Sequence, residues 1–421
     1  MSSKELHVAI AGGGLGGLCL AQGLKRAGLQ VSVFERDASP DARTQGYRIH
    51  ISPEGSEALH ACLPPKLWGL FEVTGGAQMH GFTVMTEQMQ ELLSLGHGGK
   101  PDPVRRHRSI SRVTLRRVLL SGLEEDTHWG RRFARYEVLE NGRVRLHFEA
   151  GEPVEADVLV GADGVHSRVR QQRLPGADPV EAGVVGIGGA IPLTEKTLAM
   201  VPPPLLEGPV MVLPPAACSL FVAAWRRPQG ADEILRELGL EEALEPDYLL
   251  CALGGKPEYF GLDGKVESVS GKTLKVVMRA AMQAWHPALR ELVERLDEEQ
   301  IFLNRLRTSR PQPAWTPSRV TLLGDAIHSM TPYRGTGGNI ALKDAQVLCG
   351  ALTRAARGEQ PLLEAIGEYE AAMRGYGFAA VGDSRRAMEQ FTGPKQGLGF
   401  AAMKAGMRTV NAALKLRRGV A

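Results

Sequence analysis

The sequence has few of the features that mark secreted, metal-binding or membrane-spanning proteins. Its 421 residues include five cysteines, which lie far apart and form no CxxC pair. They are too sparse for a disulfide framework and wrongly spaced for a zinc site, so we interpret them as buried apolar residues and expect no metal. No run of about 18 uncharged apolar residues occurs, and no transmembrane helix is therefore predicted.

Charge and aromatic content are also low. The net charge of +3 is close to neutral for this length and gives no reason to expect nucleic acid as a partner. The first residues lack the basic start, long apolar run and cleavage site of a signal peptide, so we expect a soluble, cytoplasmic protein. Aromatic residues make up only 5%, which argues against a substrate cage built mainly from aromatic rings.

What the sequence does contain is a βαβ pattern at its start. Residues 6–11 form an apolar run typical of a buried parallel strand, and residues 15–27 have helical character until Gly28 ends the helix. Residues 29–34 alternate as a second strand. This unit of about 30 residues predicts the start of a doubly wound α/β domain.

The turn between the first strand and the helix has the spacing G-x-G-x-x-G at Gly12, Gly14 and Gly17. Such glycines allow a tight turn, the approach of a pyrophosphate to the backbone, and close packing of helix on strand. Glu35 follows the second strand, where an acid can accept hydrogen bonds from ribose hydroxyls. A dinucleotide-binding site is predicted, with a ligand-free glycine turn as the alternative.

A second motif lies in residues 157–170. A strand ends at Gly161, Asp163 and Gly164 form a turn, and Ser167 and Arg170 follow on a helix. Alone, an Asp-Gly pair indicates no more than a good turn.

A third motif begins after the buried strand of residues 320–323. Asp325 stands at the carboxyl end of this strand, where ligands of open α/β sheets bind. A glycine-rich loop at 335–338 then opens a helix, which supplies free N–H groups and a positive dipole end. The alternative is an Asp-capped loop with no ligand.

In this order and at this spacing, the three motifs resemble those of the class A flavoprotein monooxygenases, the family of p-hydroxybenzoate hydroxylase. The resemblance runs from about residue 6 to about residue 375. It implies an enzyme that binds FAD and uses NAD(P)H and O₂ to insert one oxygen atom, by hydroxylation or epoxidation, into a small aromatic or polycyclic organic substrate. The oxygen would come from a flavin C4a-hydroperoxide, so no catalytic side chain is expected.

The resemblance also implies roles for single residues. Glu35 would bind the adenosine ribose, Arg112 the FAD phosphates, and Asp325 the ribityl and pyrophosphate part. Pro332 and residues 335–339 would line the isoalloxazine, and the loop of residues 46–49 would lie beside it. The full implied cofactor-binding set is Gly12, Gly14, Gly17, Glu35, Arg36, Arg48, Arg112, Asp163, Gly164, Asp325, Pro332, Gly335, Gly337, Gly338 and Asn339.

The substrate is expected between the flavin and residues 183–226, whose β-like runs, broken by proline clusters, predict an antiparallel sheet. Candidate substrate contacts are His50, Met211, Phe221 and Trp225, each of which also fits a purely structural role.

The predicted fold is α/β: a doubly wound, Rossmann-like FAD-binding domain with an inserted mixed or antiparallel β-sheet substrate domain and a C-terminal helical tail. The predicted segments are 1–75, 103–180 and 301–393 for the FAD-binding domain, 76–102 and 181–300 for the substrate domain, and 394–421 for a C-terminal amphipathic helix.

This last segment has six basic residues and no acid from residue 395 onward. Its expected apolar face is formed by Phe400, Met403, Met407, Val410 and Leu414. The pattern favours a helix packed on the FAD-binding domain or on a second subunit, with weak contact to a membrane surface as the alternative. A monomer and a homodimer both remain open.

Two other functions are compatible with an FAD-binding domain of this kind. A flavin-dependent halogenase is disfavoured because no tryptophan of this chain has another tryptophan two positions away. A non-catalytic flavoprotein that binds and shelters a small organic ligand could keep all three motifs, and this alternative stays open.

Overall fold

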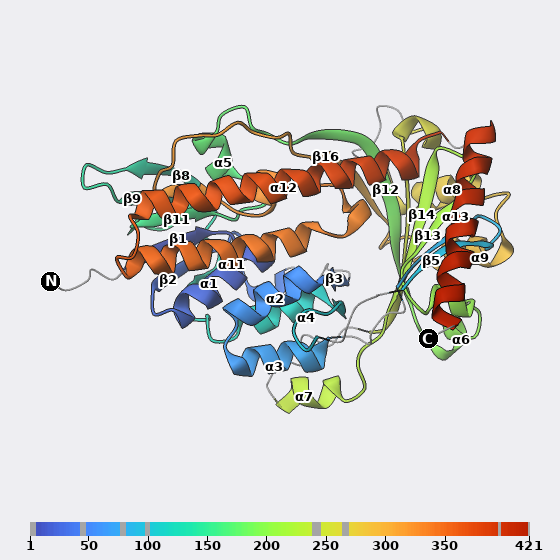
Figure 1. The fold of residues 1–421 in the computed structure, drawn as a ribbon, viewed down its shortest axis with the longest axis horizontal. Coiled ribbons are helices and arrows are strands. Elements are labelled where there is room, and N and C mark those ends of the chain that lie inside the picture. The colour runs from blue at the N-terminus through green and yellow to red at the C-terminus, as the bar shows by residue number, and fades with distance from the viewer. Residues whose placement is uncertain are drawn as a thin grey trace.

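The computed structural model describes residues 6–42, 48–75, 81–96, 102–237, 246–262, 269–394 and 397–419, and the statements below concern these residues. Two large sheets lie at opposite ends of the view, and the long helix α12 (Leu362–Thr392) runs from one to the other (Figure 1).

The first sheet is parallel throughout, with the strand order β17–β11–β1–β2–β7. Its strands are β1 (His7–Ala11), β2 (Gln30–Phe34), β7 (Thr127–His128), β11 (Val158–Gly161) and β17 (Val320–Leu322). All residues of β1, β11 and β17 are buried, because helices and loops cover both faces. The predicted βαβ unit is present, with α1 (Leu15–Arg26) between β1 and β2 and Gly28 at a φ of +83° just after the helix.

Helices pack together on one side of this sheet. The most extensive contacts of α1 are with α11 (Gly337–Ala356), which in turn packs against α2 (Pro53–Cys62) and α12. The neighbouring helices are α3 (Pro65–Thr74), α4 (Arg112–Leu120), α5 (Arg168–Arg173) and the short α10 (Asp325–His328). Smaller sheets are formed by β3 (Ile49–Ile51) with β6 (Arg108–Ile110), and by β8 (Phe133–Val138), β9 (Val144–Phe148) and β10 (Val154–Ala156).

The second large sheet has seven strands in the order β16–β12–β15–β14–β13–β4–β5. They are β4 (Phe82–Thr86), β5 (Glu91–Leu95), β12 (Val180–Pro192), β13 (Val210–Leu213), β14 (Cys218–Trp225), β15 (Tyr248–Gly255) and β16 (Phe302–Thr308). Neighbours are antiparallel except β13 and β4, which are parallel, so the sheet predicted from residues 183–226 is mixed. One face packs on α8 (Gly271–Ala281) and α9 (Pro287–Arg295) in a separate apolar core.

This arrangement confirms the predicted fold class, a Rossmann-like α/β unit with an inserted sheet and C-terminal helices. Two segments depart from the expected division. Strand β16, expected in the third FAD-binding segment, pairs with β12 in the seven-stranded sheet. Helix α7 (Ala231–Glu237), expected in the substrate domain, places Ile234 against the core of the parallel-sheet unit. The domain boundaries themselves stay predictions.

The C-terminal part is helical, as expected, with a break at 357–361, before α12, and another near Gly393, at the end of α12. Helix α13 (Gly397–Gly419) packs against the edge strand β5. Its predicted apolar face is wrong at Val410, which is 51% exposed, because Asn411 turns toward the strand instead. The Asn411 amide accepts a hydrogen bond from the Ser94 N–H at 3.0 Å and donates one to Glu91 at 2.7 Å. No helix in the described ranges is both long and apolar enough to span a bilayer.

Candidate cofactor and substrate site

The glycine turn after β1 has the geometry of a phosphate-binding turn. A Cβ on Gly12 would lie 2.3 Å from the Ala162 carbonyl oxygen, and one on Gly17 would lie 2.2 Å from the Gly12 oxygen. A Cβ on Gly14 would meet nothing within 4 Å, so the space in front of this residue is open. Gly14 is also the N-cap of α1 and provides no capping side chain, so the first N–H groups of the helix face that space.

Glu35 is buried directly behind this turn. Its carboxylate accepts hydrogen bonds from the N–H groups of Gly13, at 2.7 Å, and Asp37, at 3.0 Å. Glu35 therefore fixes the glycine turn, and the oxygens of a carboxylate can each accept a further bond from a sugar hydroxyl. Arg36 is exposed beside it.

Arg116 of α4 contacts this turn, although none of the three motifs includes it. Its guanidinium donates to the carbonyl oxygens of Gly13, at 3.2 Å, and Pro40, at 2.9 Å, and lies over the Trp129 ring. Arg116 thereby links the glycine turn to the chain segment at Pro40. No sequence signal separates it from the other arginines of the 112–117 segment.

Asp325 is the one exposed residue in an otherwise buried run from 322 to 329. It follows β17 as the first residue of α10, and its side chain is exposed at the carboxyl end of the parallel sheet. Although the side chain reaches solvent, the many protein atoms around it partly desolvate the carboxyl group and raise its pKa, and the positive charges of His328 and Arg112 oppose this rise. Arg112, exposed at the start of α4, therefore acts on the same space as Asp325.

A polar network centred on the fully buried Asp344 of α11 lies next to the α10 turn that carries Asp325. One carboxylate oxygen of Asp344 accepts from the Gly324 N–H at 2.8 Å and contacts Nε2 of His328 at 2.6 Å. The other oxygen accepts from the Tyr376 hydroxyl at 2.7 Å. Burial lowers the pKa of His328, but the Asp344 charge and hydrogen bond raise it above its ordinary value overall. The network fixes the turn that presents Asp325.

The loop before α11 lies beside strand β3 in space. It contains a short 3-10 turn, η5 (Pro332–Arg334), and Gly335 at a φ of +61°. The Asn339 amide donates to the His50 carbonyl oxygen at 2.8 Å and accepts from the Ser52 N–H at 2.8 Å. A Cβ on Gly338 would lie 2.4 Å from the Ile49 side chain. Gly338 and Asn339 thus join the loop to β3, while Gly337 is the first residue of α11.

Asp163 and Gly164 have a clear local role. The Asp163 carboxylate accepts hydrogen bonds from the Ser167 hydroxyl and from the Arg168 N–H at 2.8 Å, and so caps α5. Burial raises the pKa of Asp163, and these hydrogen bonds oppose the rise. Gly164 takes a φ of +80° that favours glycine. Their contact with a cofactor stays a prediction.

Arg48 contacts the seven-stranded sheet and His50 lies in β3, whereas residues 46 and 47 of the predicted loop fall outside the described ranges. The backbone N–H of Arg48 donates to the Tyr248 hydroxyl, and its Nε donates to Ser109 at 3.0 Å. Burial lowers the pKa of Arg48 to about 10. His50 bonds to His107 at 2.8 Å with the two rings stacked.

The three predicted substrate contacts on the sheet fall in two groups. Met211 and Phe221 are paired across β13 and β14, and they pack with Tyr333 of η5. Trp225 lies at the far end of β14, where its ring stacks on Tyr248 at a centroid distance of 5.8 Å. Side chains alternate along a strand, so Phe221 and Trp225 share the sheet face opposite the core of α8 and α9.

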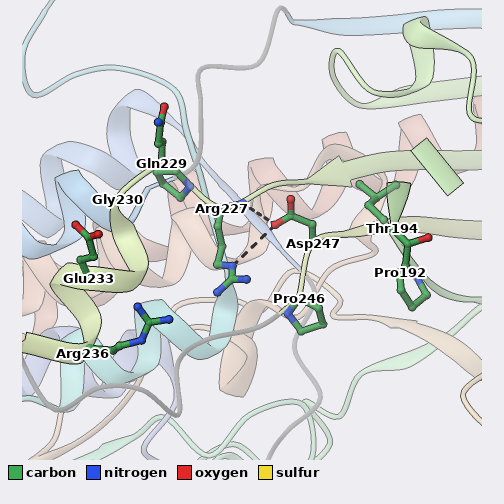
Figure 2. Close-up of a pocket in the computed structure, with 11 residues that line it drawn as sticks. Pro192, Thr194, Arg227, Gln229, Gly230, Glu233, Arg236, Pro246 and Asp247 are labelled. Carbon is green, nitrogen blue, oxygen red and sulfur yellow. Dashed lines mark hydrogen bonds and ion pairs between the residues drawn. The ribbon is translucent and has the colours of Figure 1, made fainter. Parts of the chain in front are cut away.

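A pocket of about 630 Å³ opens just beyond Trp225 and Tyr248, at the ends of the same strands (Figure 2). Arg227 and Asp247 face each other there, and the Arg227 N–H donates to the Asp247 carboxylate at 3.0 Å. No sequence motif predicted this pocket. Within the described ranges, no group of three or more His, Cys, Asp or Glu residues is placed to hold a metal ion.

Two family models match the chain. The FAD binding domain model matches residues 266–374, which contain Asp325 and the start of α11. The NAD(P)-binding Rossmann-like domain model matches residues 10–71, which contain the glycine turn and Glu35.

Among curated proteins, the chain is 33% identical over 398 residues to a dual O-methyltransferase/FAD-dependent monooxygenase of Cercospora beticola, covering 89% of this chain and 45% of that protein. The chain therefore spans less than half the length of this relative. It is 28% identical over 352 residues to 6-hydroxynicotinate 3-monooxygenase of Bordetella bronchiseptica, covering 81% of each.

Among solved structures, a candidate FAD-containing monooxygenase from Photorhabdus luminescens is 34% identical, with a TM-score of 0.81. The similarity covers 92% of this chain and 99% of that one. With the glycine turn, Glu35 and Asp325 placed as described, the chain belongs to the FAD-dependent monooxygenases.

Proposed function

We propose that this protein is an NAD(P)H-dependent FAD monooxygenase that inserts one oxygen atom from O₂ into a small aromatic or polycyclic organic substrate, by hydroxylation or epoxidation. The observation that carries the proposal is that the open glycine turn after β1 and the exposed Asp325 after β17 both lie at the carboxyl ends of strands in one parallel sheet, with only β11 between these two strands. FAD, when bound, would supply the redox chemistry that activates O₂.

The residues fit such a group in order along its length. The N–H groups at the start of α1 and the Arg112 side chain would bind the phosphates, and Glu35 would bind the adenosine ribose. Asp325 would accept hydrogen bonds from the ribityl hydroxyls. The N-terminus of α11 lacks a capping side chain, so its N–H groups and positive dipole would stabilise negative charge at the adjoining ring.

The substrate would lie between this ring and the face of the seven-stranded sheet that carries Phe221 and Trp225. The packing of Tyr333 against this face would exclude water from the reacting atoms. The Bordetella bronchiseptica relative is named for action on a hydroxylated heteroaromatic acid, which supports an aromatic substrate here.

The test is a cofactor and turnover measurement on the purified protein. It should be yellow, release FAD on denaturation, and oxidise NADH or NADPH faster when an accepted aromatic substrate is added. Colourless protein that cannot be reconstituted with FAD would contradict the proposal. FAD binding without NAD(P)H oxidation, with or without a wide panel of aromatic compounds, would instead favour a flavoprotein that only binds and shelters a ligand.

We propose a cytoplasmic protein, monomeric or homodimeric, in which α13 stabilises the seven-stranded sheet. A second role for α13, weak contact with an anionic membrane, is suggested by the exposed Leu398 and Leu416 and by the absence of acids in the helix. Co-sedimentation with vesicles containing phosphatidylserine tests this role. Salt-sensitive binding that is lost in the double variant Leu398→Ser/Leu416→Ser would support it, and equal recovery of the wild type and this variant in the supernatant would exclude it.

A further inference from the structure

Tyr333 reaches from the loop before α11 to the seven-stranded sheet. It lies in η5, in the same loop as Pro332 and Gly335, which are predicted to line the isoalloxazine. Its ring packs on the apolar cluster of the sheet that includes Met211. A side chain of the predicted flavin loop thus contacts the sheet that carries the predicted substrate contacts.

The end of the Tyr333 side chain occupies a place in the sheet where another side chain would collide with it. A Cβ on Gly254 of β15 would lie 2.2 Å from the Tyr333 hydroxyl oxygen and 3.3 Å from the ring carbon that bears it. The next nearest described atom, the Val185 carbonyl oxygen, is 3.9 Å away. The missing side chain at Gly254 therefore makes room for the Tyr333 hydroxyl.

The neighbouring strand β14 supplies a hydrogen-bond partner for this hydroxyl. Ser219 is the register partner of Gly254 and is 2% exposed. Burial raises the pKa of Tyr333, and its hydrogen bond with the Ser219 side chain opposes the rise. The phenol therefore stays neutral at physiological pH, and two uncharged hydroxyl groups bond to each other.

Ser219 and Gly254 lie on the face of the sheet that carries the predicted substrate contacts. Leu220 of β14 and Leu253 of β15 turn into the core with α8 and α9, and side chains alternate along a strand. Phe221 is the next residue after Ser219 on the same face of β14. The bond of Tyr333 therefore ends on the substrate side of the sheet, one register row from Phe221.

The loop is also held to the parallel-sheet unit and its helices. The Thr331 hydroxyl donates to the Ser384 carbonyl oxygen of α12 at 3.1 Å, and the Tyr333 ring stacks on Phe391 of α12 at a centroid distance of 6.2 Å. On another side, the Asn339 amide bonds to β3. Tyr333 adds a link from this loop to the seven-stranded sheet, and its rigid phenol ring sets the length of the link.

We propose that Tyr333 is a positioning residue whose bond with Ser219, made in the gap at Gly254, fixes the cofactor loop at a set distance from the seven-stranded sheet and so aligns the flavin ring with the substrate. The inference rests on the proposed monooxygenase function and adds a residue that acts through the cofactor loop. Reacting atoms must approach to about 3–3.5 Å, and a misplacement of about 1 Å can cost roughly a hundredfold in rate.

The first experiment measures FAD affinity and the visible circular dichroism of the bound flavin in the full chain. Tyr333→Phe and Ser219→Ala remove the same hydrogen bond from opposite sides. Each should weaken FAD binding by roughly twofold to tenfold and change the flavin dichroism. The double variant should be no worse than either single one, because only one bond is lost. The control Tyr136→Phe, in the small sheet of β8, should leave both flavin measurements unchanged.

The second experiment tests the gap in the sheet. Gly254→Ala should displace the Tyr333 hydroxyl and weaken FAD binding by roughly tenfold or more. Adding Tyr333→Phe removes the colliding oxygen and should return the affinity to that of Tyr333→Phe alone. Gly186→Ala is the matched control, because Gly186 is the register partner of Gly254 on β12 and a Cβ there would meet nothing within 4 Å. Urea unfolding of each variant measures stability separately.

Wild-type FAD affinity and flavin dichroism in Tyr333→Phe and Ser219→Ala would overturn the inference even if both unfolding midpoints fell, because the bond would then only stabilise the fold. A double variant that binds FAD no better than Gly254→Ala would also overturn it. If Gly254→Ala does not fold, the pair Tyr333→Phe and Ser219→Ala decides. Failure of the wild type to bind FAD would instead refute the proposed function.

Discussion

Replacing Asp344 with asparagine should destabilise the protein more than any other single hydrogen-bond change near the cofactor site. Asp344 is fully buried and bonds to the Gly324 N–H, the His328 ring and the Tyr376 hydroxyl. Asparagine has nearly the same shape but no charge, so protonated His328 would lose its counter-ion. Breaking a buried ion pair from one side costs about 3–5 kcal/mol, out of a typical total stability of about 5–15 kcal/mol.

The matched control is Tyr376→Phe, which removes one hydrogen bond to the same carboxylate and keeps the charge pair. It should cost about 1 kcal/mol. Urea unfolding followed by circular dichroism gives both values, and an unchanged slope with a lower midpoint identifies a true loss of stability. Equal losses for the two variants would refute the charge pair as the main contribution.

The pH dependence gives an independent check on the same reasoning. The pKa of His328 in the folded protein is raised above its ordinary value of 6.5. The stability that this group contributes is therefore complete below pH 6.5 and is lost as the pH rises through the raised pKa. The difference between wild type and Asp344→Asn should be largest in acid and shrink in alkali, and a difference that grows with pH would refute the assignment.

Three further predictions concern the cofactor site and the C-terminal helix. Asp325→Ala should lower FAD affinity by roughly one to two decades, because a hydrogen bond to a charged group contributes about 1.5–3 kcal/mol, with an unchanged circular dichroism spectrum; equal FAD affinity would refute its role. Gly14→Ala should weaken FAD binding with little change in the unfolding midpoint, whereas Gly17→Ala should lower both, because its Cβ would lie 2.2 Å from a backbone oxygen. Asn411→Ala should reduce the free energy of unfolding by about 1–3 kcal/mol, and Val410→Ala, which alters an exposed side chain, should leave it nearly unchanged; equal effects would contradict the packing of α13.

The sequence predicted the parallel-sheet unit well because its signals are local. Apolar runs marked β1, β11 and β17, and the glycines at 12, 14 and 17 have roles set by the backbone within a few residues. The position of Asp325 at a strand end followed from the same rules. The motif residues could therefore be assigned to elements before their surroundings were known.

Features that depend on distant residues could not be predicted in this way. The pairing of β16 with β12 joins segments more than 100 residues apart, and the periodicity of a strand does not reveal its partner. Arg116 resembled any arginine on a helix until its contacts with the glycine turn were seen.

The packing of α13 on β5 has a consequence for how the protein behaves in concentrated solution. Strand β5 ends a seven-stranded sheet, and an open edge offers unpaired N–H and C=O groups to any other extended chain. The side chain of Asn411 occupies the Ser94 N–H, and Lys415 forms an ion pair with Glu91 at 2.8 Å on the same strand. The C-terminal helix thereby blocks intermolecular β-pairing at this edge. Proteolytic loss of the helix would expose β5, and the protein would then self-associate through the edge of its seven-stranded sheet.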